Sequence, residues 1–324
     1  MACRRNRKTL LSDSATASVV SGFRRLLGYL ALVATPTALL ASSLFGDVTD
    51  TPLVGIYGLV GLTGATTVVA ERDRVFGVGM TSLTTDDALD AVAVVAGAVL
   101  AHVASVDLGL GSVVASALIG LLAGLLTPRV DAAAYCGSFV GMASAQVFPA
   151  VEYLFLAGGV SAVAYVAAKG TFAGVGGKLG TLALFGCVTT VALTGAEFAA
   201  GEALPPTAAA SLVPVAALAA VATVVVSQRF DYGAVVGSAL VGLVAGLLLP
   251  EFGSETLAVV AFCATFVGMS APDRLRHEGY VALAGALSGL VFIAVATAFA
   301  GAGGKLGTIA FVACISTAGV ERLV

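Results

Sequence analysis

The sequence Gly176-Gly177-Lys178-Leu179-Gly180-Thr181 recurs unchanged as Gly303-Gly304-Lys305-Leu306-Gly307-Thr308. A second segment, Phe139-Val140-Gly141-Met142, recurs as Phe266-Val267-Gly268-Met269 at the same offset of 127 residues (303 − 176 = 127). Self-similarity at a fixed offset indicates a duplicated structural unit. The chain is therefore predicted to contain two copies of one arrangement.

The duplication covers most of the chain. Other residues recur at the same offset: Cys136/Cys263, Tyr153/Tyr280, Ser161/Ser288, Phe172/Phe299 and Cys187/Cys314. Further upstream, Ser116-Ala117-Leu118 recurs as Ser238-Ala239-Leu240 at an offset of 122 (238 − 116 = 122), which places an insertion in the connection between Glu251 and Glu255. We assign residues 89–199 to repeat 1 and residues 208–320 to repeat 2.

The composition indicates a membrane protein. Of 324 residues, 59% are hydrophobic and only 11% are charged, whereas soluble domains carry roughly 25% charged residues. Disorder is excluded because so apolar a chain has ample surface to bury. The net charge of −3 provides no basic field for nucleic acid.

Twelve apolar stretches predict an all-α, polytopic membrane protein with about twelve transmembrane helices. The stretches are approximately 26–45, 53–70, 89–106, 109–127, 132–148, 151–172, 178–195, 208–227, 232–249, 256–271, 279–300 and 304–320. The stretches 132–148 and 256–271 are the shortest, and an alternative in which both are re-entrant gives ten spans. Two helices, within residues 26–88, precede the repeats as an unrepeated appendage.

The charged breaks between the stretches predict the orientation. With twelve spans, one side receives the arginine-containing breaks: 71–74, 128–129, 228–229, 273–276 and 321–322. The other side receives the acid-only breaks: Asp47 with Asp50, Asp107, Glu152, Glu197 with Glu202, and Glu251 with Glu255. Since cytoplasmic loops carry the excess of arginine and lysine, we expect a plasma-membrane protein with both termini cytoplasmic and residues 1–25 as a basic cytoplasmic tail.

Five spans per repeat imply an inversion. Because five is odd, repeat 2 must enter the membrane from the side opposite to repeat 1. The predicted architecture is two five-helix inverted-topology repeats, which resembles five-plus-five secondary carriers in general and implies a binding site between the halves.

Lys178 and Lys305 are the leading candidates for a substrate site. Each follows a glycine pair, Gly176-Gly177 or Gly303-Gly304, and opens an apolar span. Glycines allow close backbone approach, and the first turn of a helix offers unpaired N–H groups, so with a lysine they form an anion site. The alternative is a lysine that snorkels beside an inter-helix loop. A phosphate-binding loop is rejected because Phe172 and Phe299 replace its first glycine.

The repeated Phe-Val-Gly-Met segments supply two further candidates, Gly141 and Gly268. They are hypothesised to mark a broken helix whose backbone lines a cavity. The competing interpretation is close packing of helices, for which small residues are the usual device.

Sulfur side chains form a weaker candidate set. Cys136, Met142 and their copies Cys263 and Met269 are ligand types that suit soft metals such as Cu(I). Their spacing matches no metal motif, so packing is favoured and neither a metal nor a cofactor is predicted. His102 and His277 form no catalytic pattern, so an enzyme is not expected.

We therefore expect a multi-pass transporter that moves a small solute, an anion by preference, through alternating access of the two halves. No carboxylate lies deep in a predicted span, which argues against a cation carrier. Its partners are the solute and the lipid bilayer, and a homo-oligomer is compatible with this architecture. The alternatives are a channel of the same symmetry and, in a different class, a non-transporting membrane scaffold or assembly subunit.

Overall fold

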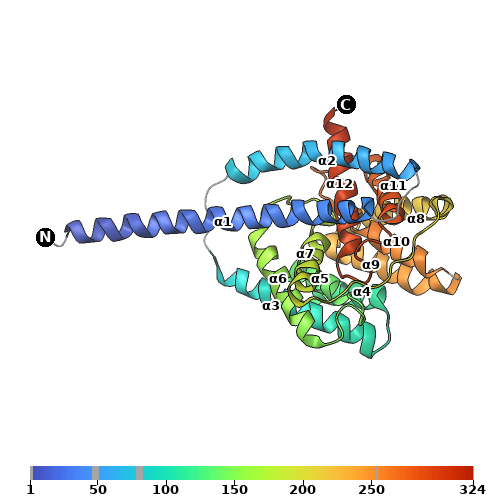
Figure 1. The fold of residues 1–324 in the computed structure, drawn as a ribbon, viewed down its shortest axis with the longest axis horizontal. Helices are drawn as coiled ribbons and strands as arrows, with labels where there is room; N and C mark the ends of the chain where they lie inside the picture. Colours follow the sequence, from blue (N-terminus) through green and yellow to red (C-terminus); the bar gives the residue numbers. More distant parts are fainter. Residues whose placement is uncertain (1–2, 46–50, 78–82, 253, 324) are drawn as a thin grey trace.

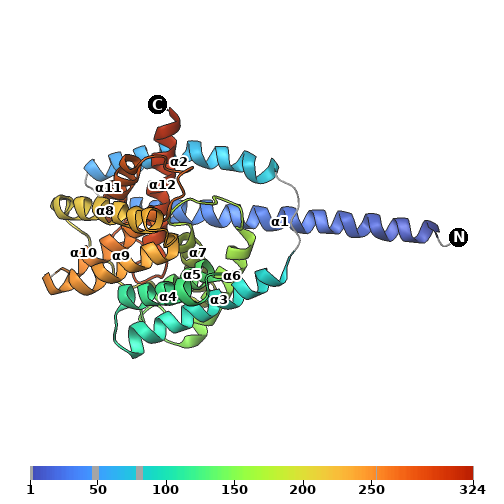
Figure 2. The ribbon, with the colours of Figure 1, turned by 180° about the vertical axis from the view of Figure 1, so that it is seen from behind.

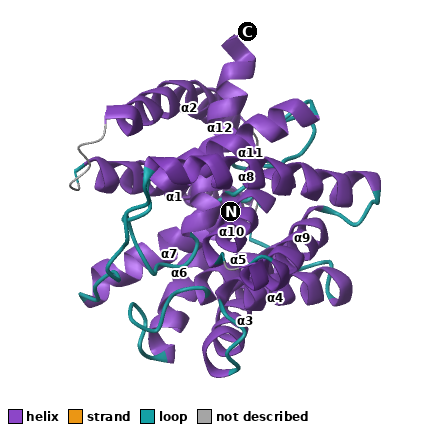
Figure 3. Cartoon of the chain, turned by 90° about the vertical axis from the view of Figure 1, so that its right-hand side faces the viewer, coloured by secondary structure: helices purple, strands orange, loops and turns teal. Residues whose placement is uncertain are grey.

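The computed structural model describes residues 3–45, 51–77, 83–252 and 254–323, and within them the side chains of 22–45, 55–75, 83–252 and 254–322. Every regular element in these ranges is helical, which confirms the all-α fold (Figure 3). Twelve α-helices are present in the described part, one for each predicted apolar stretch.

The helices have the following bounds: α1 (Cys3–Leu44), α2 (Thr51–Gly77), α3 (Thr85–His102), α4 (Ser112–Leu126), α5 (Asp131–Gly141), α6 (Val151–Ala167), α7 (Lys178–Thr194), α8 (Ala209–Val224), α9 (Ala234–Leu248), α10 (Glu255–Thr265), α11 (Glu278–Ala294) and α12 (Lys305–Leu323). Short π-helical turns at Val103–Asp107 and Val225–Arg229 extend α3 and α8. Short 3₁₀ turns lie at Pro206–Ala208, Pro250–Phe252 and Val267–Met269.

Helix α1 is much longer than the predicted first span. It has 42 residues, about 63 Å at 1.5 Å per residue, and it includes most of the predicted basic tail. Its N-terminal part projects from the body of the protein (Figure 1). The predicted tail is thus a helical continuation of the first apolar stretch.

Helices α1 and α2 form the unrepeated appendage and run antiparallel. The Tyr29 hydroxyl donates to the Val68 carbonyl near one end of the pair. At the other end, the hydroxyls of Ser43 and Tyr57 both reach the carbonyl of Ala294, at 2.7 and 2.6 Å. Because Ala294 is the last residue of α11, these bonds fasten the appendage to the C-terminus of a repeat-2 helix.

Helices α3–α7 and α8–α12 are the structural copies. Even the π-helical turns after α3 and α8 are reproduced in both. Helices α4 and α9 pack side by side (Figure 2). Val236 of α9 lies against Gly124 of α4, and its counterpart Val114 of α4 lies against Gly246 of α9, so the two copies exchange equivalent contacts.

The centre of the protein is a backbone contact between α7 and α12. A Cβ atom on Gly180 would lie 2.6 Å from the Cα of Gly307, and one on Gly307 would lie 2.6 Å from the Cα of Gly180. The backbone of Gly177, just before α7, lies against the backbone of Phe311 in α12, and that of Gly304, just before α12, lies against the backbone of Leu184 in α7. The first turns of the two helices therefore overlap and run in opposite directions. Only glycine permits this approach.

Helices α5 and α10 are the short members of each copy. Each has 11 residues, about 16 Å, which is half the thickness of a bilayer core. They meet through an aromatic quartet, whose neighbouring ring centroids are 4.4–4.7 Å apart. The quartet consists of Tyr135, Phe139, Phe262 and Phe266.

Among the residues that the structure describes, four helical segments are long and apolar enough to cross a membrane, namely Gly22–Leu44, Thr85–Asp107, Pro206–Arg229 and Ala234–Phe252. They support membrane association. Shorter apolar helices make up most of the remaining core.

Replacing Gly307 by alanine should destabilise the fold by about 1–3 kcal/mol, because the new methyl group overpacks the α7–α12 crossing. Thermal unfolding in detergent measures the effect. Gly159→Ala in α6 is the matched control, since nothing lies within 4 Å of the added Cβ. Equal stability of the two variants would contradict this account of the centre.

Candidate functional site

Two non-helical segments cross the interior and connect α6 to α7 and α11 to α12. We call residues 168–177 strap 1 and residues 295–304 strap 2. Their backbones match: Phe172 has a φ of 49° and Phe299 a φ of 48°, the left-handed region that non-glycine residues rarely occupy. Two glycines in each strap also have positive φ at equivalent positions: Gly174/Gly301 and Gly177/Gly304.

Each strap is bonded to the opposite repeat. The Ala271 N–H of repeat 2 donates to the Gly174 carbonyl of strap 1 at 2.8 Å, and the Ser144 N–H of repeat 1 donates to the Gly301 carbonyl of strap 2 at 2.9 Å. These donors follow α5 and α10, in the segments where the predicted spans 132–148 and 256–271 are no longer α-helical. The two broken spans and the two straps thus satisfy one another's backbone groups inside the protein.

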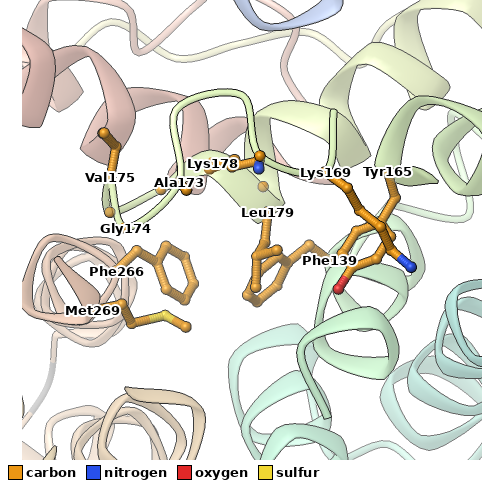
Figure 4. Close-up of a pocket in the computed structure, with 14 residues that line it drawn as sticks. Phe139, Tyr165, Lys169, Ala173, Gly174, Val175, Lys178, Leu179, Phe266 and Met269 are labelled. Carbon is orange, nitrogen blue, oxygen red and sulfur yellow. The ribbon is translucent and has the colours of Figure 1, made fainter. Parts of the chain in front are cut away.

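Strap 1 forms a wall of a cavity of about 320 Å³, which we call cavity 1. Figure 4 shows Phe266 and Met269 on one side of it and Phe139 on the other, with Lys178 and Leu179 at the start of α7. Gly176 and Gly177 also line it.

Strap 2 forms a wall of an equivalent cavity of about 330 Å³, cavity 2. Its lining repeats that of cavity 1, with Lys305, Gly304 and Leu306 in place of Lys178, Gly177 and Leu179. Gly303, the other glycine of the pair before Lys305, lies instead against the carbonyls of Phe139 and Val140.

Phe139 and Phe266 separate the two cavities. Both residues line both cavities, and their ring centroids are 4.6 Å apart. Each ring is at most 2% exposed. The lysines accordingly do not share one chamber; they line two chambers on either side of an aromatic barrier.

Each lysine bridges two helix ends. Lys178 is the first residue of α7, and its Nζ donates to the carbonyl of Ala168 at 2.8 Å, just past the last residue of α6. Lys305 begins α12, and its Nζ donates to the carbonyl of Ala296 at 2.7 Å, just past α11. A helix C-terminus carries partial negative charge, so the ammonium is well placed there.

The charges at the two cavities differ. Lys169 lines cavity 1, and its Nζ lies 2.5 Å from Asp87 and 2.6 Å from Asp90. At the equivalent position cavity 2 has Ala296, and it is also lined by Glu202 from the connection between the repeats.

Gly141 and Gly268, predicted as binding residues, are placed at helix contacts. A Cβ on Gly141 would lie 2.4 Å from the Ala98 carbonyl of α3, and one on Gly268 would lie 2.5 Å from the Ala220 carbonyl of α8. Neither belongs to the residues that line a cavity. Both glycines therefore lie where the competing interpretation, close packing of helices, places them.

Of the sulfur-containing candidates, the two cysteines are packed in the interior and the two methionines line the cavities. Cys136 donates to the Leu179 carbonyl at 3.2 Å, and Cys263 donates to the Leu306 carbonyl at 3.1 Å. Met142 lines cavity 2 and Met269 lines cavity 1. Within the described residues, no three His, Cys, Asp or Glu side chains are grouped as a metal site would require.

A buried ion pair was not identified from the sequence. Glu71 of α2 and Arg274, which follows α10, are 2% and 11% exposed, and Arg274 Nη1 lies 3.1 Å from Glu71 Oε2. The sequence showed both only as members of polar breaks. Since 203 residues separate them, no local spacing pattern could have paired them.

Comparison with known proteins identified no matching family model, no similar curated protein and no similar solved structure.

The four described cysteines should resist modification in the folded protein, because all are buried. Mass spectrometry after maleimide treatment in detergent should show no adduct on Cys136, Cys187, Cys263 or Cys314, and modification of all four after denaturation. Rapid labelling of any of them in the native state would contradict the observed packing.

Proposed function

We propose that this protein is a membrane permease for a small anion, and that its two repeats open the two cavities alternately. The observation that carries the proposal is the pair of equivalent cavities, each with a lysine at a helix N-terminus, on either side of the Phe139–Phe266 barrier. Carriers built from inverted repeats have their binding site at the interface of the repeats, and residues of both repeats line each cavity.

The chemistry of each cavity favours an anion. A lysine ammonium has three protons, and within the described contacts Lys178 and Lys305 each donate one to a protein acceptor. The remaining protons and the N–H groups of the first helix turn can bind an anion. About 320–330 Å³ exceeds the ≈ 30 Å³ share of one water by roughly tenfold, so a small organic or hydrated inorganic anion fits.

The ion pairs support the proposed inverted topology. Every salt bridge in the described part joins side chains that the twelve-span arrangement places toward the cytoplasmic side, either in a break or, for Asp90 and Lys169, near the cytoplasmic end of a stretch. Examples are Arg129 with Asp86, Arg229 with Glu278 and Arg276 with Glu321. We infer that repeat 2 is inverted relative to repeat 1, that both termini are cytoplasmic and that the plasma membrane is the location.

The straps are the moving parts in this proposal. In each, the backbone reverses at a positive-φ phenylalanine and two positive-φ glycines, and an equivalent backbone hydrogen bond links it to the opposite half. Since the two straps have matching backbone conformations, a state in which one strap retracts has a close counterpart in the other half. Movement of the straps and of the aromatic barrier would then expose one cavity at a time.

Lys178→Met and Lys305→Met should reduce anion uptake by reconstituted vesicles at least about tenfold, because each removes a charge-assisted contact worth about 1.5–3 kcal/mol while keeping the apolar stem. Formate, acetate, nitrate and phosphate form the panel. Arg129→Gln is the control, since Arg129 is exposed and lines neither cavity.

Undiminished uptake in the double lysine variant would remove the anion site. No flux of any solute through the parent protein would favour the scaffold. Flux without saturation or counterflow would favour the channel.

Leu110→Cys and Tyr232→Cys test the inversion directly. The positions are equivalent in the two repeats, and both side chains are exposed. If the repeats are inverted, an impermeant maleimide should label Tyr232→Cys only from the cytoplasmic side and Leu110→Cys only from the outside. Labelling of both from one side would show that the repeats are parallel.

A further inference from the structure

The two straps have the same shape but are held by different chemistry. In strap 2, the Ala199 N–H, in the connection between the repeats, donates to the Ala300 carbonyl at 3.0 Å, and Phe198 packs on Phe299. These contacts are neutral. The equivalent carbonyl of strap 1, that of Ala173, accepts a hydrogen bond from Arg274 Nε at 2.8 Å.

Arg274 holds strap 1 jointly with Glu71. The Phe172 N–H donates to Glu71 Oε1 at 2.8 Å, so consecutive residues of the strap are bound by the two members of one ion pair. Arg274 engages both carboxylate oxygens, at 3.1 and 3.4 Å. This two-pronged geometry fixes the pair, and with it the left-handed turn at Phe172.

The Phe172 ring completes the attachment. It is fully buried, stacks on Tyr29 of α1 at a centroid distance of 6.2 Å and meets the edge of Phe311 of α12 at 5.2 Å. Strap 1 is therefore fastened to the appendage by Glu71 and Tyr29 and to repeat 2 by Arg274 and Phe311.

We propose that Glu71 and Arg274 are positioning residues that latch strap 1 as the wall of cavity 1, so that entry to cavity 1 requires an ionic contact to break whereas entry to cavity 2 does not. The claim that the latch controls entry of a solute into cavity 1 rests on the proposed transport function. The claim that Glu71 and Arg274 hold strap 1 in place does not. The proposal also gives the unrepeated appendage a task, since α2 supplies the carboxylate.

Removing one member of the pair should release the strap. Glu71→Gln preserves the size of the side chain but leaves the Arg274 guanidinium buried without its counter-charge, and such an isolated charge is strongly unfavourable. The guanidinium is then expected to turn toward solvent, which frees the Ala173 carbonyl and widens cavity 1.

The test is cysteine accessibility at two equivalent strap positions. Val175 lines cavity 1 and is 8% exposed, and its counterpart Ala302 lines cavity 2 and is 9% exposed. Val175→Cys and Ala302→Cys are introduced separately into the full chain, and maleimide labelling rates are measured in detergent after subtraction of the rate for the parent chain. No transport is needed for this measurement.

Glu71→Gln and Arg274→Gln should each accelerate labelling of Val175→Cys at least about tenfold, equivalent to ~1.4 kcal/mol, and leave labelling of Ala302→Cys unchanged. Glu71→Asp, which keeps the charge, should give an intermediate rate.

Unchanged labelling at Val175→Cys would overturn the latch. Equal acceleration at both positions would also overturn it, because that result indicates general loosening of the fold. A selective effect in a protein without transport would uphold the latch and refute the permease.

Discussion

The contact between the backbones of Gly180 and Gly307 is the constraint on which the rest of the structure depends. A side chain at either position would separate α7 from α12. Because the first turns of these helices overlap in the interior, the straps that lead into them must also reach the interior. Their polar backbone groups must then be satisfied away from water, and the broken spans after α5 and α10 supply the partners.

This arrangement places two lysine ammonium groups inside an apolar protein, where backbone carbonyls are their hydrogen-bond acceptors. Lys178 and Lys305 stand at the starts of α7 and α12, and each is held by a carbonyl at the end of the preceding helix. The effective dielectric of such an interior strengthens any interaction with a bound ion. Phe139 and Phe266, which separate the cavities, contribute no formal charge, so the barrier is steric and apolar, whereas Lys178 and Lys305 bring charge to the cavity walls.

Much of this could be predicted from the sequence, and the remainder could not for identifiable reasons. The apolar stretches gave all twelve helices, and the glycine pairs before Lys178 and Lys305 marked helix starts that line cavities. Gly141 and Gly268 show the limit, because a glycine that admits a ligand and one that admits a neighbouring helix look identical in a sequence. The Glu71–Arg274 ion pair is a second feature that the sequence could not reveal, since the two residues meet only through the tertiary fold.

The departure from symmetry at the straps bears on why the two copies are joined in one chain. Two separate copies of a five-helix protein, assembled as a dimer, would carry every residue twice, and any fastening would be present on both sides of the membrane. In the fused chain Val147 stands where repeat 2 has Arg274, and the carboxylate that α2 supplies, Glu71, contacts strap 1. Fusion of the copies therefore permits a fastening on one strap alone, and under the proposed mechanism the two halves would differ in the energy needed to open them.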